Sequence, residues 1–226
     1  MEQSPSMKII ARIHTDFPTK FGIPRQSGLV DELQATVVFT PEYRNPDALR
    51  GIEGFSHLWL IWQFSQAVRE DWSPTVRPPR LGGNARVGVF ATRSPFRPNA
   101  IGLSCVRLES VEQSADLGPV LHVRGADLMD GTPIFDIKPY LPYADAHPDA
   151  RGGFAENGGT VLAVDFPPVL AKKIPPDKRA ALTAVLSRDP RPAYQDDPAR
   201  VYGMEFAGRN VRFRVSGSLL SVIAVE

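Results

Sequence analysis

The residues best suited to chemistry in this sequence are arginines gathered in one segment. Between Trp72 and Leu108 no acidic residue occurs. Six arginines lie in the same interval: Arg77, Arg80, Arg86, Arg93, Arg97 and Arg107. A guanidinium binds phosphate or carboxylate in a fixed fork geometry, so the cluster suits an RNA backbone or the carboxylate of a ligand. Charge alone does not separate this interpretation from a solvated face held in tertiary ion pairs.

Three polar loops offer further groups for binding. Thr92-Arg93-Ser94-Pro95-Phe96-Arg97-Pro98-Asn99 follows an apolar run and is stiffened by two prolines, and rigid loops at strand ends are common binding sites. Pro24-Arg25-Gln26-Ser27-Gly28 is the second loop, and Asp130-Gly131-Thr132-Pro133 is the third. Taken alone, the last two are ordinary turn signals. Their chemistry depends on what lies beside them.

Several classes of function are disfavoured by what the sequence lacks. It has no Rossmann glycine fingerprint, Walker loop, His-Glu-x-x-His or Gly-x-Ser-x-Gly motif. Cys105 is the single cysteine, so one chain can form neither a disulfide nor a cysteine metal site, and no metal is expected. The net charge is +1, and no apolar run has the length of a membrane span or the form of a signal sequence. We therefore expect a cytoplasmic protein.

The elements that must position these loops are short strands. Runs rich in Val, Ile and aromatic residues occupy residues 8–15, 35–40, 57–64, 85–92, 101–111 and 120–127. The 22 prolines and 18 glycines separate these runs, which favours an antiparallel barrel or sandwich. A brief connector helix is predicted after the cap Asn45. Among the apolar residues, Phe90, Met129 and Phe135 are expected in the core.

A second domain is predicted beyond a change in composition. After residue 143 the chain becomes polar and glycine-rich up to Gly159, so we place the boundary between residues 145 and 146. A strand over residues 160–166, a helix from Asp177 and three strands at 201–206, 211–215 and 219–225 follow. The expected fold is mainly β, with an antiparallel β-barrel over residues 1–145 and a small α+β C-terminal domain over residues 146–226.

Taken in order, five segments closely resemble the TrmO (TsaA-like, YaeB-like) family of methyltransferases. They span residues 21–30, 51–59, 77–84, 88–99 and 130–140, and include the motifs Pro-Arg-Gln at 24–26 and Asp-Gly-Thr-Pro at 130–133. Asp189-Pro190-Arg191-Pro192-Ala193-Tyr194 and Val211-Arg212-Phe213-Arg214-Val215 extend the resemblance into the second domain. The chain looks like the bacterial two-domain form.

The resemblance implies an enzyme with a β-barrel catalytic domain. It would use S-adenosylmethionine (SAM) to methylate N6 of threonylcarbamoyladenosine at position 37, beside the anticodon of a threonine tRNA. The partners implied are the tRNA anticodon stem-loop and a second copy of the chain in a homodimer.

The family's cofactor contacts, carried over by motif, fall on eleven residues: Pro24, Arg25, Gln26, Ser65, Gln66, Arg93, Leu103, Asp130, Gly131, Thr132 and Pro133. Ser65 departs from the pattern, because many members have histidine there. No general base is carried over. Because Arg93 alone among the clustered arginines lies in the family's cofactor motif, we assign Arg77, Arg80 and Arg86 to RNA.

The residues agree with this chemistry. SAM presents an adenine, a zwitterionic tail and a sulfonium, and the loops offer amide, guanidinium, carboxylate and carbonyl partners. Methyl transfer depends mainly on holding the nitrogen and the methyl carbon at near-attack distance, and needs neither metal nor covalent intermediate. Two alternatives stay open: a non-catalytic RNA-binding β-barrel, and a methyltransferase of this fold with another adenosine or small-molecule substrate.

Overall fold

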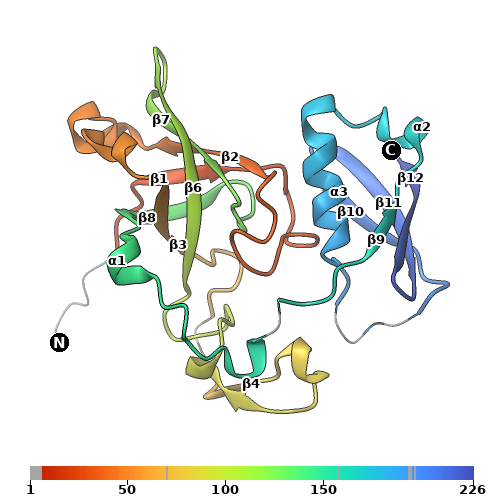
Figure 1. Cartoon of the computed structure of the whole chain (residues 1–226). Coiled ribbons are helices and arrows are strands. Elements are labelled where there is room, and N and C mark those ends of the chain that lie inside the picture. Colours follow the sequence, from red (N-terminus) through yellow and green to blue (C-terminus); the bar gives the residue numbers. More distant parts are fainter. Residues whose placement is uncertain (1–6, 70, 157, 193–194, 196) are drawn as a thin grey trace.

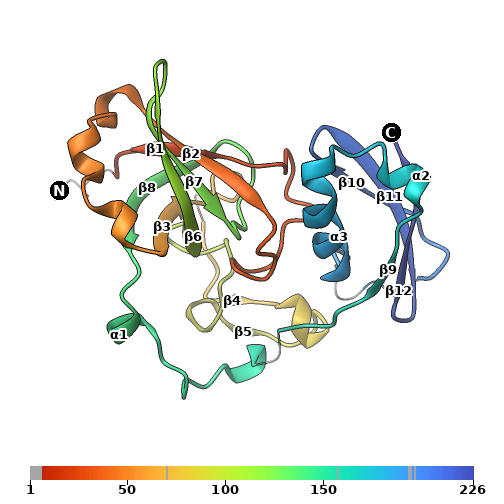
Figure 2. The same cartoon turned by 45° about the horizontal axis from the view of Figure 1, so that its top comes forward.

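A closed sheet, a four-stranded sheet and a projecting arm with a small two-stranded sheet make up the described part of the molecule (Figure 1). The computed structural model describes residues 7–226 except residues 70, 157, 193–194 and 196. It does not describe the side chain of Arg80. The first sheet closes into a barrel, the second carries a helix on one face, and the arm extends from the barrel. A view turned by 45° keeps the barrel and the second sheet side by side (Figure 2).

The barrel has six strands in the order β1-β2-β7-β6-β3-β8, and every neighbouring pair is antiparallel. Its strands are β1 (Ala11–His14), β2 (Gln34–Phe39), β3 (His57–Gln63), β6 (Ile101–Ser114), β7 (Gly118–Arg124) and β8 (Thr132–Pro139). Buried residues alternate along β1, β2 and β3, as expected where one face of each strand lines a closed core. Closure leaves no open edge in this sheet.

Three short 3-10 helices connect β2 to β3: η1 (Pro41–Tyr43), η2 (Pro46–Leu49) and η3 (Ile52–Gly54). The predicted connector corresponds to η2, and the Asn45 side chain accepts a hydrogen bond from the Asp47 backbone N–H at 3.0 Å. Pro46 occupies the first turn, where its missing N–H costs nothing.

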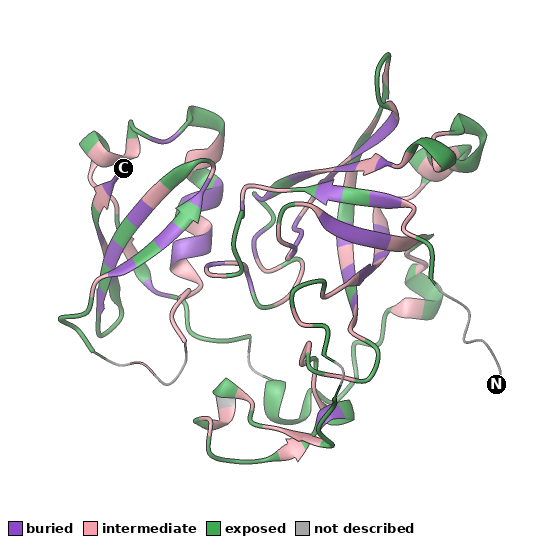
Figure 3. Ribbon diagram, turned by 180° about the vertical axis from the view of Figure 1, so that it is seen from behind, coloured by how far each residue is buried: buried purple, intermediate pink, exposed green. Residues whose placement is uncertain are grey.

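The arm, residues 66–100, leaves the barrel after β3 and returns at β6. Its elements are β4 (Thr75–Val76), η4 (Pro79–Leu81), β5 (Val87–Gly88) and η5 (Val89–Ala91). Among its described residues only Val89 is buried, and most of the arm is exposed in the view from behind (Figure 3).

The linker α1 (Pro142–Asp145) and η6 (Gly153–Ala155) leads to a four-stranded sheet of order β10-β11-β12-β9. Its strands are β9 (Ala163–Asp165), β10 (Tyr202–Phe206), β11 (Arg209–Ser216) and β12 (Leu219–Val225), with β9 parallel to β12. Between them lie α2 (Pro168–Ala171), η7 (Pro176–Lys178) and α3 (Arg179–Ser187). The expected apolar face of α3, formed by Leu182, Val185 and Leu186, is buried.

The segment between β1 and β2 packs against the second sheet. Phe17, Val30 and Leu33 belong to that sheet's core cluster, and the rings of Phe17 and Phe206 meet edge to face with centroids 5.3 Å apart. The Ala207 N–H donates to the Asp16 carbonyl at 3.0 Å. The N-terminal segment therefore completes the C-terminal core.

The predicted fold class is confirmed: the chain is mostly strand, with a closed antiparallel barrel and a small α+β unit after it. Two expectations were wrong. The strand over residues 85–92 shrinks to Val87–Gly88 because the two-stranded hairpin has no third strand or core beneath it. Phe90, expected in the core, is 71% exposed, whereas Met129 and Phe135 are half-buried. No helix in the described part of the chain is long and apolar enough to cross a membrane.

Candidate functional site

One end of the barrel gathers two of the three polar loops. The backbone N–H of Gly28 donates to the Gly125 carbonyl at 2.9 Å, which ties the loop at 24–28 to the segment that follows β7. The Ser27 hydroxyl accepts a hydrogen bond from the Cys105 N–H of β6 at 3.0 Å. A Cβ on Gly125, whose φ is +75°, would meet the backbone of Gly28 at 3.3 Å, so the close approach favours glycine.

Asp127 is a mostly buried carboxylate beneath this junction. Its Oδ1 accepts a hydrogen bond from the Ser104 hydroxyl at 2.5 Å, and the Ser104 oxygen accepts one from the Trp62 indole N–H at 2.9 Å. Burial raises the pKa of Asp127 above its ordinary value, while the Ser104 hydrogen bond, the charge of Arg93 and the backbone N–H of Ser27 oppose that rise. The carboxylate therefore links β3, β6 and both loops.

Arg93 reaches the loop at 24–28 from the arm. Its guanidinium donates to the Gln26 side-chain carbonyl, and the Gln26 amide donates to the backbone carbonyl of Arg25. The Arg25 guanidinium in turn donates to the carbonyl of Arg191 at 3.2 Å, in the segment after α3. Groups from the barrel, the arm and the C-terminal unit thus meet at one loop.

Leu103 and the Ser65-Gln66 pair lie at the same end of the barrel. Leu103 is the cross-strand partner of Ile61 and is 52% exposed, which leaves an apolar side chain open beside the buried Ser104. Ser65 and Gln66 are exposed where β3 ends, and the neighbouring Phe64 N–H donates to the Ala100 carbonyl at 2.8 Å. The structure therefore brings both to the strand pair that carries Ser104.

The Asp-Gly-Thr-Pro motif is placed differently. The Asp130 carboxylate accepts a hydrogen bond from the Thr15 N–H at 3.1 Å and contacts the His14 ring at 3.2 Å. Thr132 and Pro133 are buried at the start of β8, and the Arg12 guanidinium donates to the Gly131 carbonyl at 2.7 Å. Among the described contacts, none joins Asp130 to Arg93 or Gln26. The motif follows Asp127 in the same loop, but its hydrogen bonds go to β1 and to Thr15 just after it.

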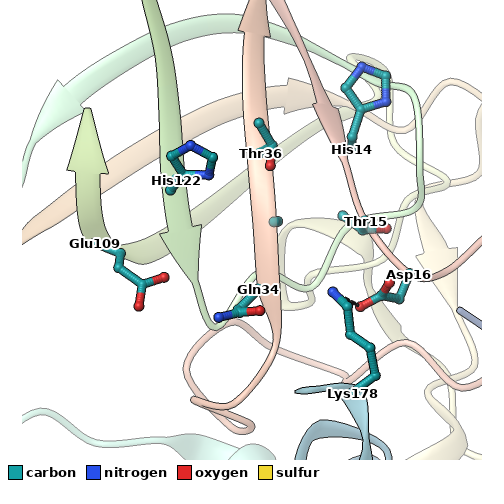
Figure 4. A pocket seen from close by; sticks show the side chains of 9 residues that line it. His14, Thr15, Asp16, Gln34, Thr36, Glu109, His122 and Lys178 are labelled. Carbon is teal, nitrogen blue, oxygen red and sulfur yellow. Dashed lines mark ion pairs between the residues drawn. The ribbon is translucent and has the colours of Figure 1, made fainter. Parts of the chain in front are cut away.

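A polar pocket of about 340 Å³ opens where the barrel meets η7 (Figure 4). It is lined by His14, Thr15, Asp16, Gln34, Ala35, Thr36, Glu109, His122 and Lys178. Its charged groups are already paired: the Lys178 ammonium lies 2.8 Å from the Asp16 carboxylate, and the carboxylate of Glu109 accepts from Arg124. We interpret this pocket as the junction of the two units.

The arginines assigned to RNA lie on the arm. Arg77 and Arg86 are exposed, and Arg86 donates to the Thr75 hydroxyl at 3.2 Å. The side chain of Arg80 lies outside the described part of the structure, although its backbone is in η4. Neither Arg77 nor Arg86 forms an ion pair within the described residues. The alternative, in which these arginines serve only tertiary ion pairs, therefore has no support at these two positions.

Asp127, Ser104 and Trp62 form a connected group that was not predicted from the sequence. A signal for the carboxylate was present, because Asp127 follows an apolar strand and precedes Asp130 by three residues. The partners of that carboxylate come from β3 and β6, and only their pairing in the barrel brings them together. No cluster of three His, Cys, Asp or Glu side chains suited to a metal occurs among the residues that the structure describes.

Two family models match the chain. The model described as the tRNA-methyltransferase O N-terminal domain matches residues 12–146, and the TrmO C-terminal domain matches residues 160–226. Together the two matches cover the barrel, the arm and the second sheet.

Relatives match over nearly the whole length. The tRNA (adenine(37)-N6)-methyltransferase of Escherichia coli is 42% identical over 226 residues, which are 96% of this chain and 96% of that protein. A protein of the same name from Eikenella corrodens is 48% identical over 76% of this chain and 97% of its own length. The crystal structure of TrmO from Pseudomonas aeruginosa superposes with a TM-score of 0.82 at 34% identity and covers 100% of both chains.

Proposed function

The chain belongs to the TrmO family, and we propose that it is a SAM-dependent methyltransferase that acts on N6 of adenosine 37 in tRNA. Curated relatives with 42–48% identity are named for this activity. The nucleoside we propose is threonylcarbamoyladenosine of a threonine tRNA, because that is the substrate of the family that the sequence resembles.

The observation that carries the proposal is the convergence of Gln26, Arg93 and Asp127. They come from a loop after β1, from the arm and from the segment after β7, and they meet at one end of a barrel. Partial burial of the Asp127 carboxylate disfavours its charged form, which is a cost to a barrel that serves only as a scaffold. Such groups cluster at functional sites.

The residues present fit SAM. Arg93 and the Gln26 amide suit its carboxylate and adenine, the exposed Leu103 offers apolar contact, and Asp127 provides a negative charge in a site that must accept a cation. We assign cofactor binding to these residues together with Pro24, Arg25, Ser65, Gln66 and the motif at 130–133. When bound, SAM would supply the methyl group: its S–CH3 bond would break as the N6–C bond forms, S-adenosylhomocysteine would leave, and the N6 proton would pass to solvent water.

The chain's own contribution is binding and orientation. Arg93 orients the Gln26 side chain by donating to its carbonyl, and Asp127 accepts from the backbone N–H of Ser27 in the same loop. Arg77, Arg80 and Arg86 bind the RNA backbone and set its register against this end of the barrel. The chain works as a homodimer in the cytoplasm, where its tRNA substrate occurs.

Incubation with SAM and threonylcarbamoylated tRNA, followed by nucleoside mass analysis, tests this function. A non-catalytic RNA-binding barrel would bind tRNA and leave every nucleoside mass unchanged. A methyltransferase for another substrate would bind SAM and leave threonylcarbamoyladenosine unmodified.

A further inference from the structure

Three large aromatic side chains of the arm are exposed to solvent close to one another. Trp72 is 51% exposed, Phe90 is 71% exposed and Phe96 is 41% exposed. The rings of Trp72 and Phe90 lie 6.0 Å apart with an interplanar angle of 32°. Neither ring belongs to one of the two core clusters, so the pair does not owe its position to core packing.

Arginine accompanies these rings. The Arg69 guanidinium lies over the Phe96 ring, 3.9 Å from its centroid. Both contacts, Trp72 with Phe90 and Arg69 with Phe96, join the outgoing half of the arm to its returning half. The rings and the Arg69 guanidinium therefore gather where residues 69–72 contact residues 90–96.

The excess of arginine over acidic residues in the arm favours an anionic partner. Residues 66–100 contain six arginines and two acidic residues, Glu70 and Asp71. Several arginines outside the arm are paired with carboxylates, including Arg50 with Asp47, Arg107 with Asp31, Arg124 with Glu109 and Arg212 with Glu226. Arg69, Arg77 and Arg86 have no such pair in the described part of the chain. Guanidinium groups without a carboxylate partner beside exposed aromatic rings suit phosphates and unpaired bases together.

We propose that Trp72, Phe90 and Phe96 form a stacking surface for the unpaired nucleobases of the anticodon loop, with Arg69 beside it. The proposal rests on the proposed function, because that function supplies the RNA. A duplex hides its base faces, whereas loop bases can be splayed out and stacked on aromatic side chains. The surface therefore distinguishes a loop from a stem and brings nucleotides beside the target to the barrel end that holds Arg93.

The test measures binding of the anticodon stem-loop RNA of threonine tRNA, and of a duplex of equal length, to the full chain. Trp72→Ala and Phe90→Ala should each weaken stem-loop binding by about 5- to 150-fold, the range expected for losing one stacked base. Duplex binding and SAM affinity should not change. The conservative variant Trp72→Phe should restore most of the affinity.

Two controls separate stacking from other effects. Tyr143→Ala removes an aromatic residue that is 88% exposed on α1, and should leave RNA binding unchanged. The salt dependence of binding should keep its slope in the aromatic variants, because they remove no phosphate contact, whereas Arg86→Ala should lower the slope by about one contact.

Three results would overturn the proposal. If Trp72→Ala and Phe90→Ala bind the stem-loop as tightly as the unaltered chain, the surface does not stack bases, while the proposed function stands. If either variant instead changes the sedimentation coefficient, a second copy of the chain covers the surface. If the unaltered chain binds no tRNA at all, this proposal and the proposed function fail together.

Discussion

Asp127 shows at the scale of a single residue how the site differs from the rest of the barrel. Its carboxylate is mostly buried, yet its contacts are a hydroxyl, a backbone N–H and the field of one arginine. Desolvation is the largest of these effects and raises the pKa. Desolvation of this carboxylate costs stability, so a role in binding explains its presence at the candidate site better than a role in folding does.

The first prediction concerns Asp127→Asn. Because the folded protein holds the Asp127 proton to higher pH than the unfolded chain does, this residue's contribution to stability is greatest at low pH and falls as pH rises through the raised pKa. Urea unfolding at a series of pH values should therefore show the variant gaining stability relative to the unaltered chain as pH rises. SAM affinity should fall in the same variant.

The control for this measurement is the exposed Asp149, since Asp149→Asn removes a surface carboxylate and should leave SAM binding unchanged. A flat difference between Asp127→Asn and the unaltered chain across the pH range would mean that the carboxylate is not desolvated in solution.

The second prediction separates two arginines. Arg93→Ala should lose SAM binding first, because Arg93 contacts Gln26 in the candidate cofactor loop. Arg86→Ala should raise the KM for tRNA and lower the salt slope by about one phosphate contact, with SAM affinity retained. Calorimetry with SAM and filter binding with tRNA give the two readouts. If both variants melt at a lower temperature and the salt slope of tRNA binding is unchanged, both arginines have a structural role and the assignment is wrong.

Residue types and their order in the sequence indicate part of this site. Pro24-Arg25-Gln26, Arg93 and Leu103 follow one family pattern, and the barrel brings them to one end. Asp127 could not be assigned from the sequence because its environment is made by β3 and β6, which are distant along the chain. Phe90 was wrongly expected in the core, since a large apolar residue is a poor indicator of burial where no second layer covers it.

At the scale of elements, the loop that carries Gln26 depends on the C-terminal sheet. The segment at 16–33 leaves β1, enters the core of that sheet and returns to β2. Gly22 marks the closest approach: its φ is +93°, and a Cβ there would lie 2.0 Å from the Met204 sulfur of β10. Met204 is 1% exposed and belongs to the core cluster of the second sheet, so its side chain would have to repack around the new Cβ.

The third prediction is that Gly22→Ala destabilises the protein and weakens SAM binding. Strain at positive φ costs about 1–2 kcal/mol, and overpacking a filled core adds about 1–3 kcal/mol. Gly51→Ala is the matched control, because Gly51 has a φ of +89° and nothing within 4 Å of the new Cβ. Urea unfolding should show the larger loss for Gly22→Ala. Equal losses would show that the loop does not rest on β10.

Strand assignments from sequence succeeded where a run was apolar and bounded by turn residues, as in β3 and β6. The sixth barrel strand, β8 (Thr132–Pro139), was not recognised, because it carries a proline near each end and follows a turn signal. Pro133 is tolerated at the start of the strand, where it pairs with Arg12. The predicted strand at 85–92 was too long. Its residues have high β propensity, but the strand pairs with β4 alone and over two residues.

At the scale of the whole molecule, the barrel, the arm and the C-terminal unit all contact one loop, residues 24–28. The described residues of the arm are mostly exposed. The Arg191 carbonyl of the C-terminal unit accepts a hydrogen bond from Arg25 of the loop, and Phe17, Val30 and Leu33 on either side of the loop pack into the core of the second sheet. One chain of 24.8 kDa therefore offers little to enclose both SAM and the anticodon stem-loop.

The fourth prediction is a homodimer. Sedimentation equilibrium at micromolar concentration should give about twice the 24.8 kDa of one chain. A single species near the mass of one chain would refute the dimer and require that one chain alone completes the site.

Methyl transfer to threonylcarbamoylated threonine tRNA is the most direct measurement. The unaltered chain with SAM should convert threonylcarbamoyladenosine into a nucleoside heavier by one methyl group, as seen by mass analysis after digestion. The Arg93→Ala variant should give little product, and tRNA without the threonylcarbamoyl group should remain unmethylated. If a folded chain that binds both SAM and this tRNA leaves the nucleoside mass unchanged, the proposed function is wrong.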